Sequence, residues 1–220
     1  MISVKEKEKQ FYLSILSDFL SKIDNNKAII PRNINFSKLH DTNYRIYHGV
    51  TKIVLVPKNK GARYVLKIPI RKEDKGFENW CEAEVRAYGE IENAGLEKFF
   101  AETDFFTDAG RCLVYIQERT CPLSHWFSGD DEWYEPQEDW SNLSQEMIES
   151  AEDLGICAQL IDALLEEYPS EEVESFLEFC NAEHINDLHS GNFGYSRSSG
   201  VPLIYDYSGI GNEARRQRGI

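Results

Sequence analysis

The chain has 220 residues, of which 41% are hydrophobic and 12% aromatic, a composition typical of a globular protein rather than a disordered one. Its formal net charge of −14 argues against binding to a nucleic-acid backbone, because phosphate contacts need clustered Lys and Arg. No apolar run approaches the ~20 residues that cross a bilayer, and the N-terminus has no cleavable hydrophobic signal. The cysteines include no Cys-x-x-Cys pair. We therefore expect a cytoplasmic protein with free thiols, no zinc site and neither membrane nor nucleic-acid partners.

The first part of the chain predicts one helix followed by strands. Residues 3–23 place apolar side chains at helical spacing and predict an amphipathic helix. An irregular connection follows over residues 31–43. The period then shortens, which predicts three consecutive antiparallel strands over residues 44–47, 52–56 and 63–68.

The third of these strands carries a lysine with a potential acidic partner on the next helix. Lys67 lies between Leu66 and Ile68, so these neighbours face one side of the strand and Lys67 the other. The next segment, residues 78–91, predicts a helix with Glu82 and Glu84, which differ by about 200° around the helix axis, so only one can face the strand. We prefer Glu84, because it is flanked by an apolar stripe formed by Trp80, Ala83, Ala87, Tyr88 and Ile91. A solvent-facing lysine and a solvated helix face remain the structural alternatives.

The middle of the chain predicts two more strands and two helices. The strands cover residues 96–106 and 111–117. An acidic and aromatic insertion at 128–138 predicts a surface loop, which tryptophans either anchor or present to a partner: Trp126, Trp133 and Trp140. Residues 145–166 then predict one long core helix, Pro169 breaks it, and residues 171–183 predict a second helix.

A polar loop and a hairpin follow, and they carry the most informative residues. The run Asp187-Leu188-His189-Ser190-Gly191-Asn192 leads into a short strand, a turn at residues 196–200 and a second strand that ends at Asp206. Such a hairpin could bring Asp187, Asn192 and Asp206 into one small volume. The oxygens of Asn192 and Asp206 suit Mg²⁺, and Asp187 would then be free to act as a base. The alternative is an Asx-rich surface turn.

This order of residues resembles the catalytic loop and metal-binding segment of the protein-kinase-like superfamily. The sequence of this run is closer to that of aminoglycoside and choline kinases, and of small kinases carried by bacteriophages, than to that of ordinary eukaryotic protein kinases. The resemblance implies an α+β fold of a minimal protein-kinase-like type. It would comprise an N-terminal helix and connection (1–43), a nucleotide-binding lobe with an antiparallel sheet and a helix (44–119), and a short, mostly helical second lobe (120–220).

The resemblance also implies roles for individual residues. Lys67 would neutralise the phosphates of ATP, Glu84 would position Lys67, Asp187 would accept the proton of the acceptor hydroxyl, and Asn192 and Asp206 would hold Mg²⁺. Gly49 would lie in the turn over the phosphates, and the backbone near Glu118 and Thr120 would bind adenine. The implied function is an ATP- and Mg²⁺-dependent phosphotransferase, acting on Ser or Thr of proteins. A small-molecule kinase and a pseudokinase that serves as a binding module are the alternatives.

Several features depart from the family pattern. Gly49 is the only glycine in its turn, Ile185 stands where kinases commonly have His or Tyr, and Asp206 and Gly209 are separated by one extra residue. Few residues follow Gly209, so we expect the helices at 145–166 and 171–183 to have few covering elements. This predicts self-association or partner docking through the second lobe, with Trp133 as a possible contact, unless the helix at 3–23 covers the gap.

Overall fold

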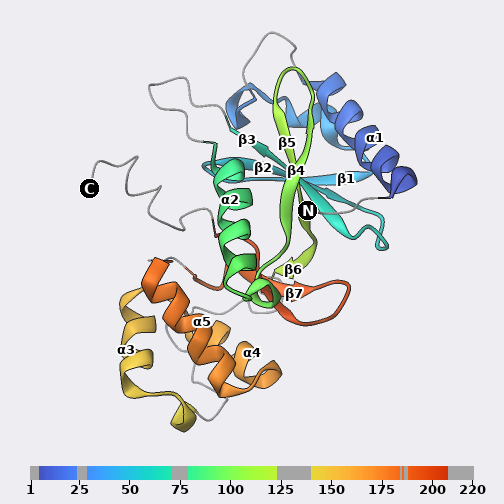
Figure 1. Ribbon diagram of the computed structural model, residues 1–220. Helices are drawn as coiled ribbons and strands as arrows, with labels where there is room; N and C mark the ends of the chain where they lie inside the picture. Colours follow the sequence, from blue (N-terminus) through green and yellow to red (C-terminus); the bar gives the residue numbers. More distant parts are fainter. Residues whose placement is uncertain are drawn as a thin grey trace. The chain divides into compact units, whose positions relative to one another are not determined.

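A computed structural model describes residues 5–23, 29–70, 79–122, 140–183, 185 and 188–207 (Figure 1). The chain divides into two compact units, a first unit of Met1–Val85 with Glu102–Arg119 and a second unit of Arg86–Ala101 with Thr120–Ile220. No helix in the described ranges combines the length and apolar character that a membrane span requires. The predicted α+β class is confirmed, with an antiparallel sheet and helix as expected of a minimal kinase-like fold. The three-segment division at residues 43 and 119 stays a prediction.

The first unit is built on a five-stranded sheet. All neighbouring strands pair antiparallel in the order β1-β2-β3-β5-β4. The strands are β1 (Tyr44–His48), β2 (Lys52–Pro57), β3 (Tyr64–Pro69), β4 (Thr103–Asp108) and β5 (Leu113–Glu118). The three strands predicted between residues 44 and 68 are therefore confirmed. Two 3₁₀ turns, Pro31–Asn33 and Phe36–Leu39, occupy the connection that the sequence predicts to be irregular.

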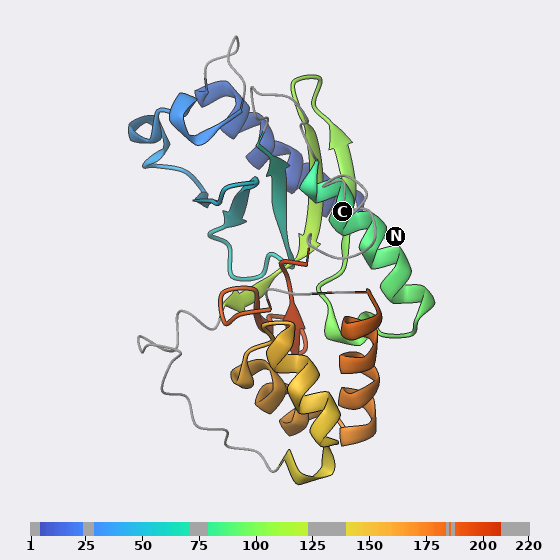
Figure 2. The same ribbon diagram turned by 90° about the vertical axis from the view of Figure 1, so that its left-hand side faces the viewer.

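The two faces of this sheet differ in chemistry. Helix α1 (Glu6–Lys22) packs Tyr12, Ile15, Leu16 and Phe19 against one face, whose strand residues are apolar: Ile53, Leu55, Leu66, Ile68, Val114 and Ile116. Figure 2 shows α1 and the start of helix α2 (Trp80–Asn93) on opposite sides of the sheet. The alternation along the strands thus dedicates one face to the apolar core and directs the other toward α2.

The second unit has its own apolar core. It contains helices α3 (Gln145–Asp153), α4 (Ala158–Glu167) and α5 (Ser170–Glu183), and a small sheet in the order β6-β7-β8. The strands are β6 (Thr120–Pro122), β7 (Phe193–Ser196) and β8 (Pro202–Ile204). Strand β6 comes so close to Gly194 that a Cβ there would overlap the backbone of Cys121, so this pairing requires glycine. The predicted second helix and the hairpin are confirmed.

Two predicted elements in this part of the chain are wrong. The helix expected over 145–166 is divided into α3 and α4, because Gly155 adopts a left-handed backbone with φ +69°. The Ile156 N–H then donates to the Ala151 carbonyl at 2.9 Å and closes the end of α3. The strand expected from residue 96 begins only at Thr103. Before it, a 3₁₀ turn at Glu97–Phe99 buries apolar side chains in the second core at a spacing of three.

The N-terminal helix and the tryptophans are predicted either to pack within the fold or to leave a surface for a partner. The apolar stripe of the N-terminal helix packs in the core of the first unit, and its covering of the helices at 145–183 stays a prediction. Trp140 is an anchor as predicted, because it packs on the second core and its Nε1–H donates to Asp162 Oδ1 at 2.6 Å. Trp126, Trp133 and the insertion at 128–138 lie outside the described residues.

Candidate active site

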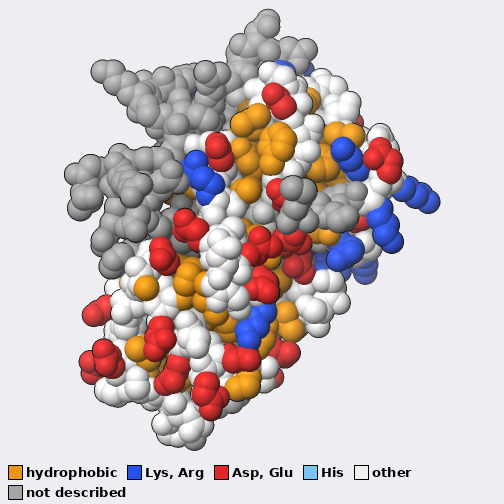
Figure 3. All heavy atoms as spheres, in the orientation of Figure 1, with side chains coloured by type: hydrophobic (Ala, Val, Ile, Leu, Met, Phe, Trp, Pro, Cys, Tyr) orange, Lys and Arg blue, Asp and Glu red, His pale blue; other side chains and the backbone are white. Residues whose placement is uncertain are grey.

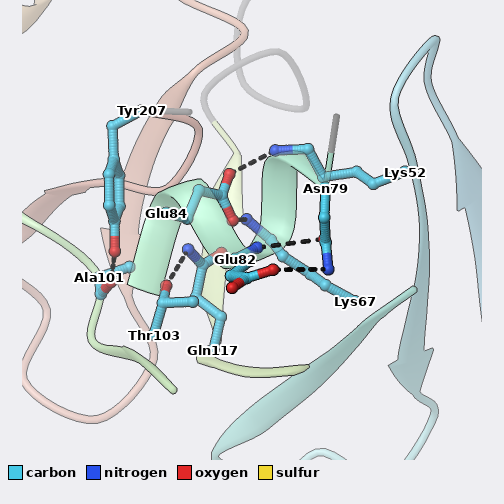
Figure 4. A network of polar contacts seen from close by, with 9 residues as sticks. All are labelled: Lys52, Lys67, Asn79, Glu82, Glu84, Ala101, Thr103, Gln117 and Tyr207. Carbon is cyan, nitrogen blue, oxygen red and sulfur yellow. Dashed lines mark hydrogen bonds and ion pairs between the residues drawn. The ribbon is translucent and has the colours of Figure 1, made fainter. Parts of the chain in front are cut away.

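A buried group of charges lies between the sheet and the start of α2 in the first unit (Figure 4). Lys67 Nζ donates to Glu84 Oε2 at 2.8 Å, and Lys52 Nζ forms an ion pair with Glu84 Oε1. Glu84 is 0% exposed, Lys67 3% and Lys52 5%. Burial of ionised groups is costly unless they are paired, so these contacts are what allow three charges inside the fold.

The strand register explains why both lysines reach the same glutamate. Val54 of β2 lies opposite Lys67 of β3, and Lys52 lies opposite Pro69. Directly opposed residues share a face of an antiparallel pair, and so do residues two apart on one strand. Lys52 and Lys67 therefore both leave the sheet on the face toward α2, whereas Ile53 and Leu66 point to the opposite core.

Helix capping explains why Glu84, and not Glu82, faces inward. Asn79 precedes α2, and its Oδ1 accepts the Glu82 N–H at 3.2 Å, while its Nδ2 lies 3.5 Å from Glu82 Oε2. Asn79 thus caps the helix through its side chain, and Glu82 lies exposed in the first turn. Glu84, two positions later, then faces Lys67. The predicted contact is present, while the catalytic roles of both residues stay predictions.

Other polar residues complete this face of the sheet. Gln117 Nε2 donates to Thr103 Oγ1 at 2.7 Å, and both side chains are buried. Tyr115, which lies opposite Lys67 on β5, has its hydroxyl bonded to Asn79 Nδ2 at 2.7 Å. Buried polar groups with satisfied hydrogen bonds hold side chains in fixed positions. The face toward α2 is thus a preorganised polar surface rather than a second apolar core.

The hairpin of the second unit holds the two predicted metal ligands next to each other. The Asn192 carbonyl accepts N–H groups from Tyr205 at 2.9 Å and Asp206 at 3.2 Å, so the backbones of Asn192 and Asp206 are neighbours. The Tyr205 hydroxyl donates to the Gly191 carbonyl at 2.6 Å. Burial and the nearby Asp206 carboxylate raise the pKa of Tyr205 to about 12. The tyrosine therefore stays neutral and ties the loop before Asn192 to the strand before Asp206.

The donor atoms of this hairpin fit a hard divalent cation. Asn192 and Asp206 are both half-buried and offer one amide and one carboxylate oxygen. Mg²⁺ is commonly held by one or two such side chains, with water and phosphate oxygens as its other ligands. Within the described ranges, no group of three or more His, Cys, Asp or Glu is placed to hold a metal. The third predicted residue of this segment, Asp187, lies outside the described residues.

The residues whose backbone is predicted to bind the nucleotide lie in a turn or at the ends of strands. Gly49 donates its N–H to the Lys52 carbonyl at 2.9 Å and closes the turn between β1 and β2. A Cβ at Gly49 would find ordinary contact at 3.9 Å, so the turn itself does not require glycine. Glu118 ends β5 with its N–H bonded to the Glu102 carbonyl at 2.8 Å, and Thr120 begins β6 opposite Ser196. Their contacts with a nucleotide stay predictions.

The sequence reasoning missed Lys52. The signal was present, because Lys52 starts its strand with Ile53 and Leu55 on the alternate positions, as Lys67 lies between Leu66 and Ile68. Only the register of β2 against β3 reveals that the two lysines share a face. That register depends on the length of the turn between the strands, which the residue pattern does not define.

Neither a protein-family model nor a curated protein matches this sequence. A search of solved structures finds the ternary complex of streptomycin, ATP and APH(2'')-IIa. The match has 14% sequence identity and a TM-score of 0.36, and it covers 96% of this chain and 72% of the other. A match of this extent identifies neither a family nor an activity for this chain.

Proposed function

We propose that this chain is an ATP- and Mg²⁺-dependent phosphotransferase that acts on an alcohol group. The observation that carries the proposal is the buried Lys67–Glu84 ion pair between strand β3 and helix α2. It is followed along the chain by Asn192 and Asp206, which the hairpin places side by side. Phosphoryl transfer requires cations that neutralise phosphate charge and side-chain oxygens that hold metal, and Lys67, Asn192 and Asp206 are the candidates for these tasks.

In this proposal each residue acts on a defined atom. The ammonium of Lys67 donates to oxygens of the nucleotide phosphates, and Glu84 fixes its position. Asp187 accepts the proton of the acceptor hydroxyl as its oxygen forms a bond to the γ-phosphorus. The bond between the γ-phosphorus and the β,γ-bridging oxygen breaks, and ADP leaves with that oxygen. Asn192 and Asp206 would hold Mg²⁺, which neutralises charge on the phosphate oxygens.

Two classes of acceptor fit the reaction. The likeness to small bacteriophage kinases supports Ser or Thr of a protein as the acceptor, whereas the Leu188 to Asn192 run also resembles aminoglycoside and choline kinases and so favours a small molecule. The alternative is a cationic small molecule such as an aminoglycoside. It is favoured by the acidic side chains on the face of the second unit that carries α3 and α5 (Figure 3). A surface of one sign raises the local concentration of oppositely charged substrates.

Radiolabelled ATP tests the proposal and separates the acceptors. The full chain is incubated with γ-labelled ATP, Mg²⁺ and either a cell lysate or a panel of small alcohols and aminoglycosides. Label on a protein supports the first acceptor class, and label on a small molecule supports the second. Lys67→Ala and Asp187→Asn should remove the label, while Lys60→Ala, which changes an exposed lysine, should not. Absence of transfer from the wild-type chain to every acceptor would overturn the proposal.

A pseudokinase is the second candidate, and the turn at Gly49 favours it. Kinases cover the phosphates with a glycine-rich loop, whereas this turn has one glycine and does not depend on it. A pseudokinase would bind ATP without transferring phosphate. Calorimetric binding of ATP together with the labelling experiment distinguishes the two functions.

A further inference from the structure

We propose that Lys52 is a second phosphate-binding lysine, which holds the nucleotide polyphosphate together with Lys67. The inference rests on the proposed function, because it assumes that ATP binds on this face of the sheet. It adds a residue that the kinase-like motifs of the sequence do not include. The starting observation is that Glu84 pairs with two lysines from two different strands.

The position of Lys52 suits a phosphate ligand. It is the first residue of β2, directly after the turn that the resemblance places over the phosphates, and its carbonyl closes that turn by accepting the Gly49 N–H. Its side chain leaves the sheet on the same face as Lys67. At 5% exposure, its ammonium is held inside the fold and not extended into solvent. Lys52 therefore connects the turn to the charged group around Glu84.

The charges of this group favour an anion. Glu84 offers one carboxylate to the two ammonium groups of Lys52 and Lys67, and all three side chains are buried. An anion is attracted more strongly in such a low-dielectric environment than in water. An ammonium group has three donor protons, so each lysine can bind a phosphate oxygen while Glu84 positions it. A nucleotide polyphosphate is the anion that the proposed function brings to this face.

The turn before Lys52 contains only one glycine, and Lys52 can supply a phosphate contact there. A glycine-rich loop binds phosphates through backbone N–H groups, and the N–H of Gly49 is already bonded to Lys52. A lysine at the base of the turn supplies positive charge next to a backbone N–H that is already engaged. We therefore assign to the Lys52 side chain part of the task that backbone amides perform in glycine-rich loops.

Equilibrium binding tests this assignment with a readout other than activity. ATP, ADP and adenosine are titrated calorimetrically into the full chain and into Lys52→Met, Lys52→Arg and Lys67→Met. Lys60→Met, at the other end of the β2–β3 segment, is the control for an exposed lysine. We expect Lys52→Met to weaken ATP and ADP by about tenfold or more, the effect of one charge-assisted hydrogen bond, and to leave adenosine unchanged. Lys52→Arg keeps the charge and should bind ATP better than Lys52→Met.

The outcomes separate this inference from the proposed function. If the wild-type chain binds ATP and Lys52→Met binds it equally well, the assignment of Lys52 is wrong and the phosphotransferase proposal stands. If ATP and adenosine weaken by the same factor, Lys52 is a structural residue and the assignment also fails. If the wild-type chain does not bind ATP, both proposals fail. Should Lys52→Met not fold, as judged by circular dichroism, Lys52→Gln takes its place in the same comparison.

Discussion

At the scale of single residues, the charge of Glu84 should stabilise the fold, because this carboxylate pairs with two buried lysines. Glu84→Gln would leave Lys52 and Lys67 buried without the carboxylate that pairs with both. We expect a loss of about 3 kcal/mol or more in the free energy of unfolding, the usual effect of removing one partner from a buried ion pair. Glu82→Gln is the matched control on the exposed side of the same helix and should change stability by less than about 1 kcal/mol. Urea unfolding measures both, and equal effects would contradict the assignment of Glu84.

Lys67 and Asp206 should affect transfer rather than folding. In Lys67→Ala the Glu84 carboxylate keeps Lys52 as its partner, and in Asp206→Asn the side chain keeps its size and one oxygen. We expect each variant to lower the transfer rate on the order of a hundredfold or more, because both remove charge from a phosphate or metal site. Initial rates with labelled ATP and thermal unfolding are measured together. Near wild-type turnover in either variant would remove that residue from the proposed mechanism.

At the scale of elements, two glycines should respond oppositely to alanine. Gly155 ends α3 with φ +69°, a conformation that costs an alanine roughly 1–2 kcal/mol. Gly89 lies within α2, and a Cβ added there would meet no atom within 4 Å beyond its chain neighbours and the nearby backbone of its own helix, so alanine should stabilise the helix by about 0.5–1 kcal/mol. Urea unfolding of Gly155→Ala and Gly89→Ala checks the two signs. A stabilising Gly155→Ala would mean that α3 and α4 form one continuous helix.

The same elements explain what the sequence could predict. Alternation and helical spacing identified the strands around Lys67 and the helix with Glu84, because each pattern reflects a single buried face. The break at Gly155 was missed, since α3 and α4 pack on the same core and the apolar spacing continues through the break. A strand was expected at Phe99 and Phe100, because the two buried side chains of this 3₁₀ turn form a short apolar run like that of a strand. That Lys52 and Lys67 share a face depends on the register of two paired strands, which no local pattern contains.

At the scale of the whole molecule, the described part of the second unit offers little apolar surface for association. Among the described residues, the exposed large hydrophobic side chains belong to the first unit: Phe36, Tyr47, Val50, Phe105 and Leu113. Figure 3 shows apolar side chains over β4 and β5, and acidic side chains interspersed with smaller apolar areas over the helices of the second unit. The premise of wide uncovered stripes on α3 to α5 is therefore not met in these residues. Self-association through this unit stays a prediction, which sedimentation of the full chain measures.

The N-terminal helix should be essential for the first unit. It buries Tyr12, Ile15, Leu16 and Phe19 on the sheet. At about 1.5–3 kcal/mol for each large side chain, the sum is roughly 6–12 kcal/mol as an upper bound. Whole domains are stable by only about 5–15 kcal/mol. We therefore expect a chain without residues 1–24 to lose the fold of the first unit, because its deletion leaves the apolar face of the sheet uncovered.

Two substitutions in the full chain separate this effect from the loss of length. Leu16→Asp places a charge in the core beneath α1, and Ser17→Asp places the same charge on the exposed side of the helix. Leu16→Asp should reproduce the instability of the shortened chain, while Ser17→Asp should resemble the wild type in thermal unfolding and in sedimentation. A shortened chain that stays folded and monomeric would show that the sheet does not need α1 as its cover. A shortened chain that stays folded but associates would mean that the uncovered sheet face is stable enough to become an interface.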